Sequence, residues 1–163
     1  MTTAFTFTTV PKTLFQPGSS THLAKTAAPA LKGAQRILFV TDQGVLKAGL
    51  ADAALAGLKD AGLEVHVYDK VVADPPESTV FEAVQEGQEF GAEAVIGFGG
   101  GSSMDVAKLV ALLAHPNCTQ TLQDIYGVGN ARGQRLPLIQ VPTTAGTGSE
   151  VTQIAIITTG ATT

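Results

Sequence analysis

The sequence is poor in cysteine, with Cys118 as its one example in 163 residues. A single thiol forms neither an internal disulfide nor a paired-cysteine metal site, and this predicts an intracellular, cytoplasmic protein. Long apolar runs are lacking too, since none approaches the roughly 20 residues of a transmembrane helix. The N-terminus has no basic segment followed by an apolar one, so no secretory signal is expected.

Clusters of basic residues are also missing. The 10 Lys and Arg residues are scattered, and 14 acidic residues bring the net charge to −4. This distribution argues against a nucleic acid or an anionic membrane as the partner and favours a small neutral or anionic ligand that is bound locally. A composition of 44% hydrophobic and 15% charged residues is typical of one folded domain with a buried core.

Strand-like and helix-like segments alternate along most of the chain. Apolar runs predict strands or strand-like elements at residues 36–42, 64–69, 92–100, 136–144 and 151–159. Helices are predicted at 45–62, from a cap at Ser78 to Phe90, and at 104–115, the last of them apolar almost all round. This alternation indicates an α/β fold with a doubly wound, mainly parallel sheet covered on both faces.

The N-terminal residues follow a different pattern. Residues 4–16 alternate aromatic or apolar side chains with threonine, break at Pro17 and Gly18, and resume at 20–23. This alternation predicts an N-terminal β-hairpin or edge strands, whose edge offers a surface for pairing with a second copy of the chain.

Glycine is concentrated in "GFGGGSSMDVAK", Gly97–Lys108. Each glycine loses much backbone freedom on folding, so such a run needs a compensating interaction. The glycines at 99–101 follow a predicted strand and Ser102 or Ser103 can cap the next helix, so the helix N-terminus predicts a phosphate site. The alternative is a tight strand-to-helix turn in which glycines allow close packing. Asp105 fits either an acid that complements the helix dipole or an anchor that shapes the loop.

Two further pieces indicate a nucleotide ligand. Asp42 ends the first buried strand, where a carboxylate accepts hydrogen bonds from both hydroxyls of an adenosine ribose and repels a 2′-phosphate, which favours NAD over NADP. The alternative is a turn-forming Asp ahead of Gly44. Residues 141–152, "VPTTAGTGSEVT", are mostly small or hydroxyl-bearing and follow a buried strand, so they predict contact with a flat polar ligand, with a polar surface loop as the alternative.

In this order, these pieces resemble the iron-containing (group III) alcohol dehydrogenase family. "GGGSSMD" is similar to the family motif G-G-G-S-x-x-D, and "PTTAGTGSEVT" is similar to its signature P-T-T-x-G-T-x-S-E-x-T. The resemblance implies that residues 1–163 are an N-terminal dinucleotide-binding domain, of the kind found in dehydroquinate synthase. It also implies a pyrophosphate at the glycines, an adenosine ribose at the end of the first strand and a nicotinamide beside the threonines. The implied cofactor-binding residues are Asp42, Gly100, Gly101, Ser102, Asp105, Thr143, Thr144 and Thr147.

Family members continue into an all-helical domain whose Asp and three His residues bind Fe(II) or Zn(II), and this sequence ends before it. The histidines present here, His22, His66 and His115, have no metal-site spacing and are predicted to be structural or solvent-facing. The resemblance therefore implies the cofactor half of a metal-dependent enzyme, often dimeric, that transfers hydride between a small alcohol or aldehyde and NAD. Alone, this half is expected to be inactive.

Two alternatives stay open at this point. One is a non-catalytic NAD-binding module, which the missing metal domain suggests. The other is a related oxidoreductase such as glycerol dehydrogenase or maleylacetate reductase, which share a similar glycine loop. The threonine-rich signature favours the alcohol dehydrogenases.

Overall fold

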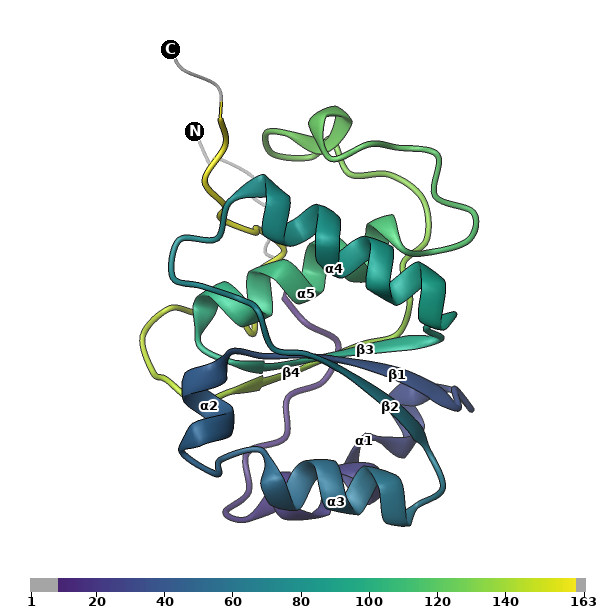
Figure 1. Ribbon diagram of the computed structural model, residues 1–163, viewed down its shortest axis with the longest axis vertical. Coiled ribbons are helices and arrows are strands. Elements are labelled where there is room, and N and C mark those ends of the chain that lie inside the picture. Colours follow the sequence, from purple (N-terminus) through teal and green to yellow (C-terminus); the bar gives the residue numbers. More distant parts are fainter. Residues whose placement is uncertain (1–8, 161–163) are drawn as a thin grey trace, which may run out of the picture.

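The computed structural model describes residues 9–160, and its centre is a four-stranded sheet (Figure 1). The strands are β1 (Arg36–Val40), β2 (Glu64–Tyr68), β3 (Ala94–Gly99) and β4 (Leu138–Pro142). They pair in parallel in the order β2-β1-β3-β4. The predicted α/β fold with a doubly wound parallel sheet is therefore confirmed.

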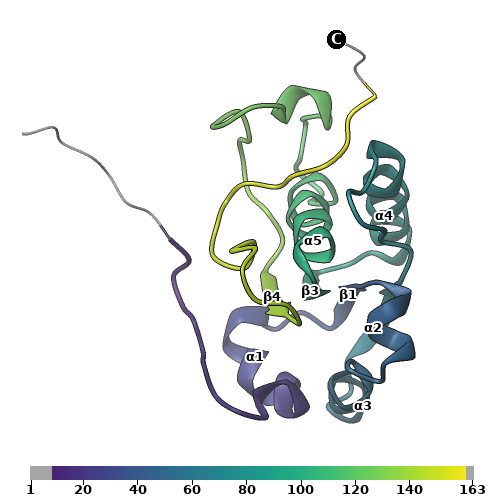
Figure 2. The same cartoon turned by 90° about the vertical axis from the view of Figure 1, so that its left-hand side faces the viewer.

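Helices cover both faces of this sheet (Figures 1 and 2). One layer holds α1 (Leu23–Leu31) and α3 (Asp52–Asp60), and the other holds α4 (Glu77–Phe90) and α5 (Gly101–Leu113). The short α2 (Gln43–Lys47) follows the end of β1. Among residues 9–160, no helix has the length and apolar character needed to cross a membrane.

β1 explains why the apolar runs of the sequence become buried strands. Ile37 and Phe39 belong to the core on the α1 and α3 side of the sheet, whereas Leu38 and Val40 belong to the core on the α4 and α5 side. All four side chains are fully buried. A strand with helices on both faces needs apolar residues at every position, and burying each one contributes about 1.5–3 kcal/mol.

α5 packs against the sheet and against α4, its neighbour in the same layer, and this enclosure agrees with its apolar sequence. The two helices approach closely at Gly87 of α4. A Cβ atom there would lie 3.2 Å from the Leu38 side chain and 3.7 Å from Val110 of α5. This packing makes α5 the most enclosed helix of the layer and fixes the position of its N-terminus relative to the sheet.

The predicted N-terminal hairpin is wrong for the described residues, and residues 1–8 lie outside them. Residues 20–23 belong to a 3-10 helix, η1 (Ser19–His22), and to the start of α1. Leu23, Ala27 and Leu31 recur every four residues, and burying this stripe favours a helix over a strand. The hairpin edge expected to pair with a second copy is thus absent from residues 9–35.

Two helix predictions also need correction. The single helix expected over 45–62 is divided between α2 and α3, because Gly49 adopts a left-handed conformation with φ of 69° that no helix continues through. Ser78 does not cap α4, which begins one residue earlier at Glu77 with Pro76 as its N-cap. The extended conformation of Pro76 ends the preceding loop instead.

The predicted strand-like element at 151–159 forms no strand. Thr158 makes an isolated bridge with Pro76, and its N–H donates to the Pro75 carbonyl at 2.8 Å. Other backbone groups of this segment bond to side chains of α5 instead of to a neighbouring strand. Because these partners satisfy the backbone, the apolar sequence here does not produce a sheet.

Candidate functional site

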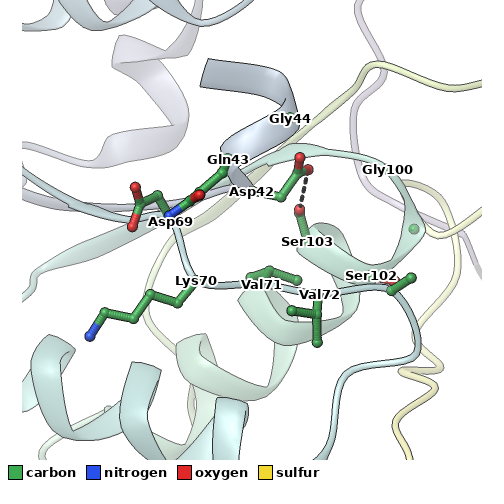
Figure 3. Close-up of a pocket in the computed structure, with 12 residues that line it drawn as sticks. Asp42, Gln43, Gly44, Asp69, Lys70, Val71, Val72, Gly100, Ser102 and Ser103 are labelled. Carbon is green, nitrogen blue, oxygen red and sulfur yellow. Dashed lines mark hydrogen bonds between the residues drawn. The ribbon is translucent and has the colours of Figure 1, made fainter. Parts of the chain in front are cut away.

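A cavity of about 640 Å³ opens at the carboxyl ends of β1, β2 and β3 (Figure 3). Its walls are formed by three segments, at residues 42–44, 69–73 and 100–103. The chain leaves β1 toward β2 on one side and later returns to β3 on the other, so the cavity lies at the topological switch point of the sheet. Ligands of open α/β sheets bind at this place.

Packing explains two of the three clustered glycines. A Cβ atom on Gly99, whose φ is 153°, would lie 2.7 Å from the Ser103 hydroxyl, and one on Gly101 would lie 3.2 Å from the Thr147 methyl group. Gly100 differs, because its φ is −78° and its nearest neighbour would be 3.6 Å away. The close-packing alternative therefore holds for Gly99 and Gly101. Gly100 lines the cavity, and a Cβ atom there would make only an ordinary contact with Thr144.

The N-terminus of α5 is bare at this wall. Gly100 is the N-cap residue, and among the described residues no side chain caps the helix, so the prediction that Ser102 or Ser103 does so is wrong. The Ser103 hydroxyl donates to the Asp42 carboxylate instead. The first N–H groups of a helix have no intrahelical acceptor and carry the positive end of the helix dipole, so they form an anion site.

Asp42 joins two elements at the edge of the cavity (Figure 3). Its Oδ1 accepts the Val45 N–H at 3.0 Å and thereby caps α2. Its Oδ2 accepts the Ser103 hydroxyl at 3.3 Å, across 61 positions of sequence. The turn-forming role of Asp42 is therefore present, and the same carboxylate lines the cavity, where a ribose was predicted.

The charge of the cavity wall is mainly negative. Asp42 and Asp69 line it, together with Lys70. However, the Lys70 ammonium bonds to Glu82 at 2.6 Å and Glu86 at 2.9 Å, and its side chain extends away from the serines in Figure 3. These two hydrogen bonds hold the pKa of Lys70 above its ordinary value. Lys70 is thus engaged with α4 and is not directed at a ligand in the cavity.

The predicted threonines flank the glycines without lining this cavity. The Thr143 N–H donates to the Gly99 carbonyl at 2.8 Å, which extends the pairing of β4 with β3. Thr144 lies near Gly100 and Thr147 near Gly101. All three threonines are exposed to solvent. The structure therefore brings them to the glycine loop, on the β4 side of it.

Asp105 faces away from the cavity. Its Oδ1 accepts a hydrogen bond from the Lys108 ammonium at 3.0 Å, and its Oδ2 accepts one from the Ile156 N–H at 3.0 Å. Lys108 also donates to the Ile154 carbonyl at 2.6 Å. Of the two interpretations of Asp105, its contacts agree with the anchor, although the residue that it holds is Ile156, beyond the threonine-rich loop.

Sequence reasoning missed several residues of this region. It gave no role to Lys108, although a Lys three residues after an Asp on a helix is a recognisable signal for an ion pair. It also missed Ser103 as a partner of Asp42, and the cavity wall from Asp69 to Ala73. The Asp42 to Ser103 bond and the cavity wall bring together segments that are far apart in the sequence, so no local sequence pattern predicts them.

Comparison with known proteins identifies the chain. Residues 11–163 match the family described as "Iron-containing alcohol dehydrogenase". The chain belongs to the iron-containing alcohol dehydrogenase family. The match covers the glycine loop, Asp42 and the threonine-rich signature, so the family resemblance drawn from these residues is confirmed.

Individual relatives agree with this membership. Long-chain-alcohol dehydrogenase 1 of Geobacillus thermodenitrificans is 42% identical over 126 residues, 77% of this chain and 32% of that protein. NAD-dependent methanol dehydrogenase of Bacillus methanolicus is 36% identical over 129 residues, 79% of this chain and 33% of that protein. The crystal structure of NADH-dependent butanol dehydrogenase A of Thermotoga maritima matches with a TM-score of 0.84 and 32% identity, covering 96% of this chain and 38% of that one. The chain thus spans about a third of the length of these curated relatives.

The histidines of the chain are placed apart from one another. The His66 ring bonds to Glu86 at 2.7 Å, and the His115 ring accepts the Asn117 N–H at 3.1 Å. His22 lies in η1. Within residues 9–160, no three His, Cys, Asp or Glu side chains are grouped so that they could hold a metal ion.

Proposed function

We propose that this chain is the NAD-binding part of an alcohol dehydrogenase that transfers hydride between a small alcohol or aldehyde and nicotinamide. The observation that carries the proposal is the bare N-terminus of α5 beside Gly100, at the switch point of the sheet. Relatives named as NAD-dependent methanol dehydrogenase and NADH-dependent butanol dehydrogenase support the choice of cofactor and of substrate class.

The residues at the cavity suit a dinucleotide. The volume of about 640 Å³ lies in the range of small-molecule sites, and the uncapped N-terminus of α5 offers its N–H groups to a phosphate at the cavity wall. The pyrophosphate is assigned to Gly100, Gly101 and Ser102. The adenosine ribose is assigned to Asp42, whose carboxylate oxygens have acceptor capacity beyond their two protein partners.

The preference for NAD over NADP follows from charge. A 2′-phosphate at Asp42 would meet that carboxylate and face a wall that also contains Asp69. Lys70, the basic residue of the same wall, is held by Glu82 and Glu86 and does not compensate. NADP binding would therefore require a carboxylate to move or to be neutralised.

The remaining predicted residues receive separate roles. Thr143, Thr144 and Thr147 are assigned to the nicotinamide side, because they flank the glycines and expose their hydroxyls. Asp105 contributes by holding the segment beyond these threonines. When bound, the nicotinamide ring accepts or supplies the hydride, while this chain binds and orients it. No metal step is assigned to the described residues.

The test is isothermal titration of the full-length protein that carries this chain with NAD⁺ and NADP⁺. The unmutated protein is expected to bind NAD⁺ more tightly than NADP⁺. Gly100→Val places a branched side chain beside the bare N-terminus of α5, in a backbone conformation that valine tolerates, and it is expected to weaken NAD⁺ binding by about tenfold or more. Gly160→Val, at a glycine with no neighbour within 4 Å, is the matched control. Failure of the folded, unmutated protein to bind either nucleotide would overturn the proposal.

A further inference from the structure

We propose that Ser103 is a positioning residue for cofactor specificity, because it fixes the Asp42 carboxylate in the orientation that accepts a ribose and rejects a 2′-phosphate. This inference rests on the proposed function of the cavity as an NAD site. It assigns a role to a position that the glycine motif G-G-G-S-x-x-D leaves open, since Ser102 fills the motif serine and Ser103 follows it.

The Asp42 carboxylate is held from two sides. The Val45 N–H of α2 binds one oxygen at 3.0 Å, and the Ser103 hydroxyl of α5 binds the other at 3.3 Å. One bond alone would leave the carboxylate free to turn about it. With donors from two separate helices, both side-chain torsions of Asp42 are restrained at a position where the residue lines the cavity, and its oxygens keep further acceptor capacity.

Ser103 is well placed to act through Asp42. It is 1% exposed, so water does not compete for its hydroxyl. It lies in the first turn of α5, whose packing fixes its position. Gly99 provides the necessary space, because a Cβ atom there would lie 2.7 Å from the Ser103 hydroxyl and 3.2 Å from the Asp42 carboxylate.

The hydrogen bond from Ser103 to Asp42 also determines which groups of Ser103 remain for a ligand. A serine hydroxyl has one proton, and here that proton is directed to Asp42. Ser103 therefore presents only oxygen lone pairs toward an anion, in contrast to Ser102, which is partly exposed and lines the cavity. Two neighbouring serines thus serve different parts of the site, with Ser102 for the pyrophosphate and Ser103 for the carboxylate.

The test compares two serine-to-alanine variants of the full-length protein by isothermal titration with NAD⁺ and NADP⁺. Ser103→Ala frees Asp42 to turn away, so the ratio of the NADP⁺ Kd to the NAD⁺ Kd is expected to fall by about threefold or more. Ser102→Ala, the matched control, removes a contact common to both nucleotides and is expected to weaken both equally, leaving the ratio unchanged. Ser103→Cys, which keeps the shape but is a weak donor, is expected to behave like Ser103→Ala.

A double-variant comparison shows whether Ser103 acts through Asp42. In a protein that already carries Asp42→Ala, adding Ser103→Ala is expected to cause no further change in the ratio of the NADP⁺ Kd to the NAD⁺ Kd. A ratio that Ser103→Ala and Ser103→Cys leave unchanged, or one that still falls without Asp42, overturns this inference alone. If the folded, unmutated protein binds neither nucleotide, the proposed function fails and this inference fails with it.

Discussion

Asp105 and Lys108 lie one turn apart on α5 and form an ion pair at 3.0 Å in which both side chains are largely buried. Each of the two residues also forms a hydrogen bond outside the pair. Asp105 accepts the Ile156 N–H, and Lys108 donates to the Ile154 carbonyl, so the two residues fasten an irregular segment to the helix. The threonine-rich loop is therefore tied at one end to β4 and at the other to α5.

Replacing Lys108 with methionine is expected to destabilise the fold. Lys108→Met keeps most of the apolar stem but leaves the Asp105 carboxylate buried without its cation, and breaking such a pair costs about 3 kcal/mol. Urea denaturation gives the free energy of unfolding. Lys59→Met, at an exposed position of α3, is the control and is expected to change this value by less than about 0.5 kcal/mol. Equal stabilities of the two variants would contradict the anchoring role.

Two glycine substitutions separate packing from ligand access. Gly99→Ala places a methyl group 2.7 Å from the Ser103 hydroxyl at a φ of 153°, and it is expected to lower the free energy of unfolding by roughly 2 kcal/mol. Gly100→Ala has room and an ordinary φ, so it is expected to leave stability within about 0.5 kcal/mol. Thermal and urea unfolding measure both, and a stable Gly99→Ala protein would disprove the steric account.

The stability provided by Glu86 is expected to depend on pH. Burial raises the pKa of this carboxyl, but the hydrogen bonds from His66 and Lys70 outweigh burial and hold the pKa below its ordinary value. A carboxyl with a lowered pKa in the folded state stabilises the protein at neutral pH, and this contribution is lost as the pH falls through the folded-state pKa. Glu86→Gln is therefore expected to cost about 1 kcal/mol at neutral pH and less in acid.

Urea denaturation at several pH values from neutral to acid tests this expectation. Glu64→Gln is a suitable control, because Glu64 is exposed on β2 and has no side-chain partner recorded in the described part of the chain. The difference between the Glu86→Gln variant and the unmutated protein is expected to shrink toward acid. A difference that stays constant with pH would show that the charge of Glu86 is not the source of its effect.

The sequence predicts best where one physical requirement dominates. Residues 37–40 of β1 and all of β3 are buried, so every residue there must be apolar or small, and such a run cannot be mistaken for a solvent-exposed segment. The same holds for α5, whose enclosure requires an apolar surface almost all round. The place of the glycines at the carboxyl end of β3 follows from these two elements.

Prediction from the sequence failed where a local pattern is compatible with both helix and strand and tertiary contacts decide between them. Residues 20–23 are predicted to continue a hairpin, but they lie in η1 and at the start of α1, because Leu23 and Leu31 are buried at helical spacing. The pattern of residues 151–159 predicts a strand, but backbone groups of this segment form hydrogen bonds with side chains of α5. The Asp42 to Ser103 contact joins residues 61 positions apart, and no periodicity encodes it.

The enclosure of α5 also has a consequence for the thermodynamics of the proposed nucleotide binding. Fixing a flexible residue costs about 1–2 kcal/mol of backbone entropy, and a disordered phosphate loop would incur that cost each time it closes on a ligand. Here the donor groups at residues 101–103 begin a helix that is packed against both the sheet and α4. They are preorganised, so nucleotide binding is expected to carry a small conformational entropy penalty and to leave amide hydrogen exchange in α5 nearly unchanged.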